Sequence, residues 1–243
     1  MQRDGKLIFD IGMSEGDDTS FYLRKGFRVV GVEADPTLRQ HLQDRFQHEI
    51  ADGRLAVVNR AAGARAGEQI AFYSDLREQG HSSVVHQGDP SGVERHTVLT
   101  TDWSELVAAH AVPYYLKIDI EGGEPEFLSG MLGSSLYPHY ISAEIQTFRP
   151  IELFRQMGYE RFRIINQVKV NQFPIPNPPL EGNLLPAPES HRWSGLFGRE
   201  LPGKQWFSFE EITEIHRMLH QLWTYETVTV GWLDCHAWMP DGA

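Results

Sequence analysis

One stretch near the N-terminus constrains the fold more than any other: Leu7 to Ser20, which reads LIFDIGMSEGDDTS. Its apolar run ends in Asp10, and Gly12 and Gly16 follow. Glycines at such a turn let the backbone approach a ligand, and the N–H groups that open the next helix can bind an anionic part of it. The stretch therefore predicts a strand, a tight turn and a helix, the last over about Thr19 to Lys25.

The spacing of these glycines does not match two common phosphate-binding patterns. A dinucleotide fold has G-x-G-x-x-G and a P-loop has Gly-Lys-Ser/Thr, whereas no lysine follows Gly16 here. The next expected strand, Phe27 to Val32, ends in Glu33. A βαβ nucleotide site places an acid at that position to accept two ribose hydroxyls. We therefore expect a ligand that contains a nucleoside, and the glycine spacing disfavours a nicotinamide dehydrogenase.

The rest of the chain alternates between apolar strands and amphipathic helices. Pro36 and the four-residue spacing of apolar residues predict one helix over Thr37 to about Ile50. Such near-continuous apolar strands are typical of a parallel sheet covered on both faces. The pattern predicts an α/β fold whose ligand lies at the carboxyl ends of the strands. Five further core strands are expected, at Leu55–Val58, Tyr114–Ile118, Tyr140–Ala143, Phe162–Ile165 and within Thr227–Trp238.

Three motifs resemble the class I S-adenosylmethionine-dependent methyltransferases and, among them, the FkbM family. Asp10, Gly12 and Gly16 match the first motif of that family, Asp-x-Gly-x-x-x-Gly. The run KIDIEGGE that starts at Lys117 matches its K-I-D-x-E-G-x-E signature, and WSGLFGREL from Trp193 resembles a segment found in a subset of the family. The resemblance covers nearly the whole chain.

This resemblance implies a Rossmann-like class I methyltransferase fold, with a seven-stranded, mostly parallel sheet and an antiparallel last strand. It implies transfer of a methyl group from S-adenosyl-L-methionine to a hydroxyl of a small molecule or glycan. Two alternatives stay open, an N-methyltransferase and a non-catalytic nucleoside-binding or interaction protein of the same fold. The candidate cofactor-binding residues are Asp10, Gly12, Met13, Ser14, Gly16, Thr19, Glu33, Ala34, Ala61 and Asp119.

Four acids cluster where two expected strands end: Asp119, Glu121 and Glu124 after one strand, and Glu144 after the next. Carboxylates this close raise one another's pKa unless a positive group compensates them. The sulfonium of the cofactor, a divalent ion bound through oxygens, or Lys117 could each do so. Asp119 and Glu144 are candidate catalytic residues beside the transferred methyl group. Glu121 and Glu124 could instead cap the next helix, a role we favour for Glu124. Metal dependence is left open.

Histidines supply a further catalytic candidate. His81 lies in a long polar loop, Ser74 to Arg95. A neutral imidazole suits proton removal near neutral pH, so His81 is a candidate general base. His191 is a second candidate, whereas His236 is expected to be a packed core histidine.

From Asn171 to about Phe207 the chain becomes rich in proline. We expect one domain, residues 1–243, in which this segment is a lid-like insertion over the substrate, because it follows a strand that ends at the ligand edge. Its aromatic residues either line a pocket for the acceptor or anchor the segment to the core: Trp193, Phe197, Trp206 and Phe207.

Charge and composition narrow the expected partners and compartment. The formal net charge of −11 argues against nucleic acid, whose binding rests on clustered Lys and Arg. Cys235 is the only cysteine, which fits a reducing, cytoplasmic compartment. No apolar run approaches the ~20 residues of a membrane span, and the first strand begins too early for a signal peptide. We therefore expect a small-molecule or carbohydrate acceptor, no nucleic acid and no membrane, with a homo-oligomer left open.

Overall fold

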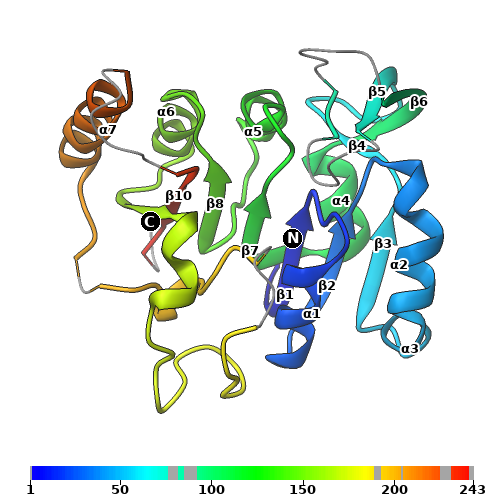
Figure 1. The fold of residues 1–243 in the computed structure, drawn as a ribbon, viewed down its shortest axis with the longest axis horizontal. Helices are drawn as coiled ribbons and strands as arrows, with labels where there is room; N and C mark the ends of the chain where they lie inside the picture. The colour runs from blue at the N-terminus through cyan, green and yellow to red at the C-terminus, as the bar shows by residue number, and fades with distance from the viewer. Residues whose placement is uncertain are drawn as a thin grey trace.

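Seven strands form the main sheet of the protein. The computed structural model describes residues 2–75, 82–84, 92–188, 193–203, 205–224 and 231–240. Neighbouring strands pair in parallel except β10, which runs antiparallel to both β8 and β9. The prediction of a seven-stranded, mostly parallel sheet with an antiparallel last strand is confirmed. The spatial order (Figure 1) is β3 (Leu55–Val58), β2 (Arg28–Val32), β1 (Arg3–Ile11), β7 (Val112–Ile118), β8 (Tyr140–Glu144), β10 (Leu233–Trp238) and β9 (Arg161–Asn166).

The direction of the strands explains why acids gather at one edge of this sheet. Apolar residues fill β1 and β7 because both strands lie inside the sheet and are covered on both faces. Asp10 lies near the end of β1, Asp119 follows β7, and Glu144 ends β8. Parallel strands bring their carboxyl ends to the same edge, so these three acids lie along it. The antiparallel β10 reaches this edge with its first residues.

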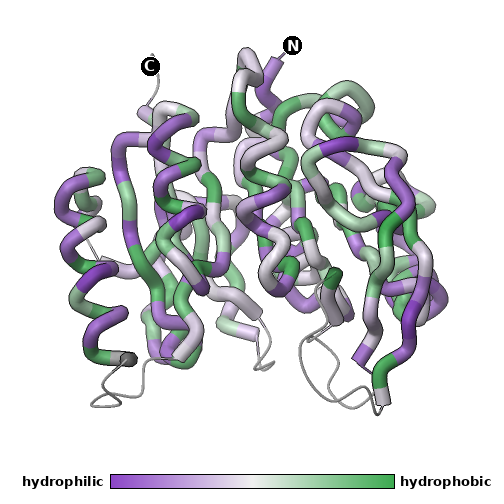
Figure 2. Tube along the Cα trace, turned by 90° about the horizontal axis from the view of Figure 1, so that it is seen from above, coloured by the Kyte–Doolittle hydropathy of each residue, from purple (hydrophilic) through white to green (hydrophobic). Residues whose placement is uncertain are grey.

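Four helices cover one face of the sheet: α4 (Trp103–His110), α5 (Glu124–Met131), α6 (Arg149–Gln156) and α7 (Phe209–Thr224). Their apolar side chains share one core with the strands. Along α7, at the left edge of Figure 2, green and purple residues alternate, as expected of a helix with one buried side. In the described part of the chain, no helix is long and apolar enough to cross a lipid bilayer.

The opposite face is covered over the first three strands by α1 (Asp17–Arg24) and by short helical pieces. The single helix predicted over Thr37 to Ile50 is wrong, because the helix breaks at Phe46, which has φ −114° and ψ 22°. The ring of Phe46 occupies the space that a side chain on Gly16 would need. The break therefore lets Phe46 pack against the glycine turn. The pieces are η1 (Pro36–Leu38), α2 (Arg39–Arg45) and α3 (Gln47–Ala51).

The proline-rich segment covers the rest of that face. It begins within η2 (Gln167–Gln172) and contains η3 (Gly198–Glu200). Phe197 is fully buried, with its ring 5.0 Å from that of Tyr115 on β7. A buried ion pair, from Lys25 Nζ to Glu200 Oε2 at 2.6 Å, fastens the segment to the end of α1. Of the two roles expected for Phe197, lining an acceptor pocket or anchoring the segment to the core, the structure shows the second. Closure as a lid stays a prediction.

A second sheet adds a wall beside the ligand edge, at the upper right of Figure 1. Its strands are β4 (Ala61–Ala62), β6 (Val93–Thr101) and β5 (Gln69–Asp75), in that order. β5 and β6 form an antiparallel pair. The hydroxyl of Ser74, on β5, donates a hydrogen bond of 2.8 Å to Asp35 and so ties this small sheet to the end of β2.

Candidate active site

A cavity of about 400 Å³ opens at the carboxyl ends of the parallel strands. Its walls come from the glycine turn after β1, the ends of β2, β7 and β8, the small sheet and the proline-rich segment. We call the part lined by Ser14, Glu33 and Asp35 the turn end. The acid end is the part lined by four acids, Asp119, Glu121, Glu144 and Asp234.

The turn end depends on glycine at two positions. Gly12 and Gly16 have φ of 81° and 88°, a conformation that costs other residues about 1–2 kcal/mol. A Cβ on Gly12 would lie 1.7 Å from the backbone oxygen of Asp119, and one on Gly16 would lie 2.4 Å from the ring of Phe46. The two glycines therefore let the turn lie directly against the end of β7 and against Phe46.

Glu33 is buried after β2 and accepts two backbone hydrogen bonds. The N–H of Ser14 donates to Oε2 at 2.7 Å, and the N–H of Asp35 donates to Oε1 at 2.8 Å. Each oxygen of a carboxylate can accept more than one hydrogen bond, so both keep acceptor capacity. Burial raises the pKa of Glu33 to about 7, although the two N–H groups pull it down.

Asp35 organises the neighbouring wall and is not among the residues predicted from the sequence. Its carboxylate accepts hydrogen bonds from the N–H and hydroxyl of Thr37. The hydroxyls of Ser74 and Ser82 also donate to it, at 2.8 and 3.0 Å. The Asp-Pro-Thr order was a usable signal, because Asp35 caps η1 with Pro36 at the first helical position.

Lys117 is a buried cation that three carboxylates share. Its Nζ lies 3.2 Å from Oδ2 of both Asp18 and Asp119, and 3.6 Å from Oδ1 of Asp10. Burial alone would lower the pKa of Lys117, but these carboxylates outweigh it and hold that pKa well above its usual value. Burial raises the pKa of Asp10 to about 6 against the pull of Lys117. Ser194 in turn donates to Asp18 through its N–H and its hydroxyl, at 2.8 and 2.7 Å. Of the three compensating groups considered from the sequence, Lys117 is present and lies beside Asp119.

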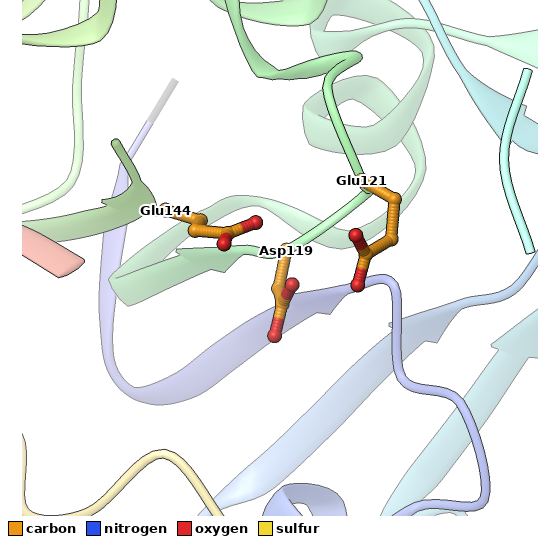
Figure 3. A group of neighbouring side chains, drawn as sticks. All are labelled: Asp119, Glu121 and Glu144. Carbon is orange, nitrogen blue, oxygen red and sulfur yellow. The ribbon is translucent and has the colours of Figure 1, made fainter. Parts of the chain in front are cut away.

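The acid end brings together three carboxylates from separate parts of the backbone. One oxygen of each of Asp119, Glu121 and Glu144 lies within 4.8 Å of the others. Figure 3 shows Glu121 and Glu144 approaching Asp119 from opposite sides. Burial, and then the neighbouring charges, raise the pKa of Glu144 to about 7 and that of Glu121 to about 8. The prediction that Asp119 and Glu144 lie within reach of one another is confirmed.

The turn that carries Glu121 is held from two sides. Glu121 has φ of 54°, which is uncommon for a residue other than glycine. Its backbone oxygen accepts a hydrogen bond of 2.8 Å from the hydroxyl of Ser83. Glu124 accepts hydrogen bonds from the N–H groups of Ile120 at 2.8 Å and Gly122 at 3.0 Å. Glu124 is thus the structural acid that was predicted, whereas Glu121 directs its carboxylate to the acid end (Figure 3).

Two cavity residues, Gln167 directly after β9 and Asp234 on β10, were missed by the predictions. Asp234 is 6% exposed and lies directly opposite Glu144 in the pairing of β10 with β8. Burial raises the pKa of Asp234 well above its usual value. Gln167 is 9% exposed, and its Nε2 has no hydrogen-bond partner among the described residues. The signal for Asp234 was the antiparallel direction of β10, which puts its first residues at the ligand edge. Gln167 follows β9, which runs antiparallel to β10 and so ends at the same edge.

Most of the predicted cofactor-binding residues line the cavity. Asp10 and Thr19 do not, because they lie behind the turn, where the hydroxyl of Thr19 donates to Asp10 at 2.7 Å. The candidate bases His81 and His191 lie outside the described residues. His236 is 2% exposed within β10, so the prediction of a packed core histidine is confirmed. The residues that do line the cavity are Gly12, Met13, Ser14, Gly16, Glu33, Ala34, Ala61 and Asp119.

Known methyltransferases share parts of this sequence and align with this structure. The probable ribosomal RNA small subunit methyltransferase A of Methanospirillum hungatei is 44% identical over 54 residues, which span 22% of this chain and 21% of that protein. The match thus spans about a fifth of the length of this curated relative. A precorrin-6y C5,15-methyltransferase of Geobacter metallireducens aligns with a TM-score of 0.41 at 12% identity, covering 99% of this chain and 82% of that one. A SAM-dependent methyltransferase of Geobacter sulfurreducens, solved with S-adenosyl-L-homocysteine, aligns with a TM-score of 0.39 at 12% identity, covering 98% and 86%.

The family follows from a match to the methyltransferase FkbM domain, which covers residues 10–164. These residues run from the end of β1 into β9 and include the glycine turn, Glu33 and the three converging carboxylates of the acid end. Gln167 and Asp234 lie beyond the match. The chain therefore belongs to the FkbM methyltransferase family.

Proposed function

We propose that the protein transfers a methyl group from S-adenosylmethionine to a hydroxyl oxygen of a small molecule or glycan. The observation that carries this proposal is Glu144, which lines the cavity and whose pKa is raised to about 7 by burial and Asp119. A hydroxyl must lose its proton as its oxygen takes the methyl carbon, and a base is most effective when its pKa lies near the working pH. An alcohol is a poor nucleophile until it loses its proton, so a base at this position supports O-methylation.

The turn end fits the nucleoside part of the cofactor. Glu33 keeps acceptor capacity on both oxygens, as two ribose hydroxyls require. Gly12 and Gly16 bring the backbone close without side chains in the way. Asp119 lies at the acid end, where its negative charge would attract the positive sulfonium of the cofactor. When bound, S-adenosylmethionine supplies an electrophilic methyl group, while the residues of the chain bind it, orient it and hold the acceptor.

We place the acceptor at the acid end, next to Gln167 and the proline-rich segment. Trp193 and Ser194 are the described residues of that segment that line the cavity. The unpartnered amide nitrogen of Gln167 can donate to an oxygen of the acceptor. We therefore propose that Trp193 and Gln167 set acceptor choice and that the segment closes over the acceptor. The single, fully buried Cys235 suits a reducing compartment such as the cytoplasm.

The test uses S-adenosylmethionine with a ¹³C-labelled methyl group. The protein is incubated with this cofactor and a panel of hydroxyl-bearing and amine-bearing small molecules and glycans. ¹³C NMR of the products distinguishes O-methyl from N-methyl carbons. Transfer to oxygen supports the proposal, and transfer to nitrogen alone would replace it by N-methylation. Cofactor binding in a calorimeter with no transfer to any acceptor would favour the non-catalytic alternative.

Two substitutions then assign the roles within the cavity. Glu144→Gln should lower turnover on the acceptor that is found, and Trp193→Leu should change the relative turnover of different acceptors. Both variants should bind S-adenosylhomocysteine as the parent does. If Trp193→Leu left the acceptor preference unchanged, the proline-rich segment would have no role in acceptor recognition.

A further inference from the structure

The acid end carries more negative charge than the described part of the chain compensates. Lys117, the lining cation at this end, is shared with Asp10 and Asp18. The carboxylate of Glu121 receives no hydrogen bond from the described residues, and that of Glu144 receives one, from Gln146 at 3.3 Å. These carboxylates are half-buried, and partial desolvation and mutual repulsion disfavour their charged forms unless a positive ligand joins them.

The geometry of the three carboxylates suits one small cation. Their nearest oxygens lie within 4.8 Å of one another. Oxygens that share one Mg²⁺ or Ca²⁺ lie 2.0–2.6 Å from it and so are at most about 5 Å apart. Lys117 lies 3.2 Å from Oδ2 of Asp119, which leaves the second oxygen of that carboxylate for another partner. In Figure 3 the side chains of Glu121 and Glu144 converge on Asp119 as such a site requires.

A second observation, outside these three residues, points to the same place. Asp234 is 6% exposed, lines the cavity and lies directly opposite Glu144. Directly opposed residues of an antiparallel pair have their side chains on the same face, close together. Among the described residues, none donates a hydrogen bond to the carboxyl group of Asp234, although buried polar groups are normally paired. Asp234 can therefore accept a hydrogen bond from a ligand beside Glu144, and water bound to a cation is such a donor.

We propose that Asp119, Glu121 and Glu144 bind one hydrated divalent cation of the Mg²⁺ or Mn²⁺ type, and that Asp234 accepts a hydrogen bond from its bound water. The cation would neutralise the acid end and offer an open coordination position to the oxygen of the acceptor. This site rests on the proposed function and refines it: with the cation bound, Glu144 would serve as a ligand rather than as the base, and the cation would lower the pKa of the acceptor hydroxyl.

The test measures binding of Mn²⁺, which electron paramagnetic resonance detects directly. The full chain is freed of metal with a chelator and titrated with MnCl₂, with and without S-adenosylhomocysteine. We expect one Mn²⁺ per chain. Glu121→Gln and Glu144→Gln should each weaken binding more than tenfold, and Asp234→Asn by about tenfold. Glu126→Gln is the matched control, because Glu126 is exposed at the start of α5, does not line the cavity and loses the same charge.

Absence of binding at millimolar Mn²⁺ would overturn the proposal. An equal loss of Mn²⁺ affinity in Glu126→Gln and Glu121→Gln would also overturn it, because it would indicate that Mn²⁺ responds to surface charge alone. Binding of S-adenosylhomocysteine is measured separately, by calorimetry in the presence of the chelator. Cofactor binding without Mn²⁺ binding would leave the proposed function standing and remove the metal site. Binding of Mn²⁺ without binding of S-adenosylhomocysteine would contradict the proposed function instead.

Discussion

The two ends of the cavity differ in how far the chain satisfies its own acids. At the turn end, Glu33 has two N–H donors, and Asp35 has donors from Thr37, Ser74 and Ser82. At the acid end, Glu121 and Asp234 receive no hydrogen bond from the described residues. The chain itself therefore satisfies the acids of the turn end, whereas we propose that a ligand satisfies those of the acid end.

Lys117 joins the two ends, because it contacts Asp10 and Asp18 behind the turn and Asp119 at the acid end. It balances part of the negative charge and leaves the remainder at Glu121, Glu144 and Asp234. Ser194 extends this network to the proline-rich segment through Asp18. We therefore expect substitutions at the turn end to alter cofactor affinity, substitution of Lys117 to alter folding stability, and substitutions at the acid end to alter turnover.

Gly12→Ala should disrupt the structure of the turn end, and its effect on cofactor binding is the largest that we expect. Its Cβ would overlap the backbone oxygen of Asp119, at 1.7 Å, so the turn and the end of β7 must separate. We expect no cofactor binding detectable by calorimetry. Gly67→Ala is the control, because Gly67 has a similar φ of 80° with nothing within 4 Å of a Cβ. It should cost about 1–2 kcal/mol of stability and leave cofactor affinity unchanged. Equal behaviour of the two variants would mean that backbone strain, rather than close approach, explains the glycine.

Lys117→Met should remove the ion pairs that connect the two ends of the cavity. Removing the cation leaves buried carboxylates unpaired, so the free energy of unfolding should fall by about 3–5 kcal/mol in urea denaturation. Lys169→Met, at an exposed position, should change it by less than about 0.5 kcal/mol. A loss below about 1 kcal/mol for Lys117→Met would show that the carboxylates are neutralised without the lysine.

Asp119→Asn and Glu144→Gln should sharpen the comparison at the acid end. Each replaces a candidate catalytic carboxylate by a neutral isostere, so turnover on an identified acceptor should fall by about 100-fold. The measurement is initial-rate kinetics with saturating S-adenosylmethionine, with Glu126→Gln as the control of unchanged rate. Parent-like rates in both variants would exclude these acids from the reaction.

The smallest expected effect is the pH dependence of cofactor affinity, which reports on the turn end alone. Two ribose hydroxyls donate best to an ionised Glu33, whose pKa is raised to about 7 by burial. Below that pH, binding must release a proton, so affinity should fall by up to about tenfold per pH unit as the pH decreases. Affinity should level off above pH 7. Calorimetry from pH 5.5 to 8.5 measures this, and Glu33→Gln should lose the slope. If the affinity of Glu33→Gln still fell with decreasing pH, a titratable group other than Glu33 would be responsible.

The sequence predicted the parallel part of the site well, for a physical reason. Apolar strands covered on both faces can be recognised from composition, and their carboxyl ends share one edge, so Glu33, Asp119 and Glu144 follow from local sequence. Asp234 required the direction and register of β10, which depend on pairing with β8 and β9. The break at Phe46 was missed because it arises from packing against a glycine distant in sequence.

The proline-rich segment shows a second limit. Its composition correctly excluded long regular structure, but which aromatic rings meet the cavity depends on tertiary contacts. Phe197 is held between helix and sheet by Tyr22 and Tyr115. Trp193 is also buried, with its ring 4.9 Å from that of Phe21, but it contributes to the cavity wall. Only the fold distinguishes these two neighbouring aromatic residues.

The central claim is that the turn end holds the cofactor while the acid end serves the reaction. The most direct test is calorimetric titration of S-adenosylhomocysteine into the parent, Glu33→Ala and Glu144→Gln at pH 8. Two charge-assisted hydrogen bonds of about 1.5–3 kcal/mol each are lost in Glu33→Ala, so its affinity should fall by at least about 100-fold. Glu144→Gln should stay within about threefold of the parent. Parent-like affinity in Glu33→Ala, or an equal loss in both variants, would contradict the account.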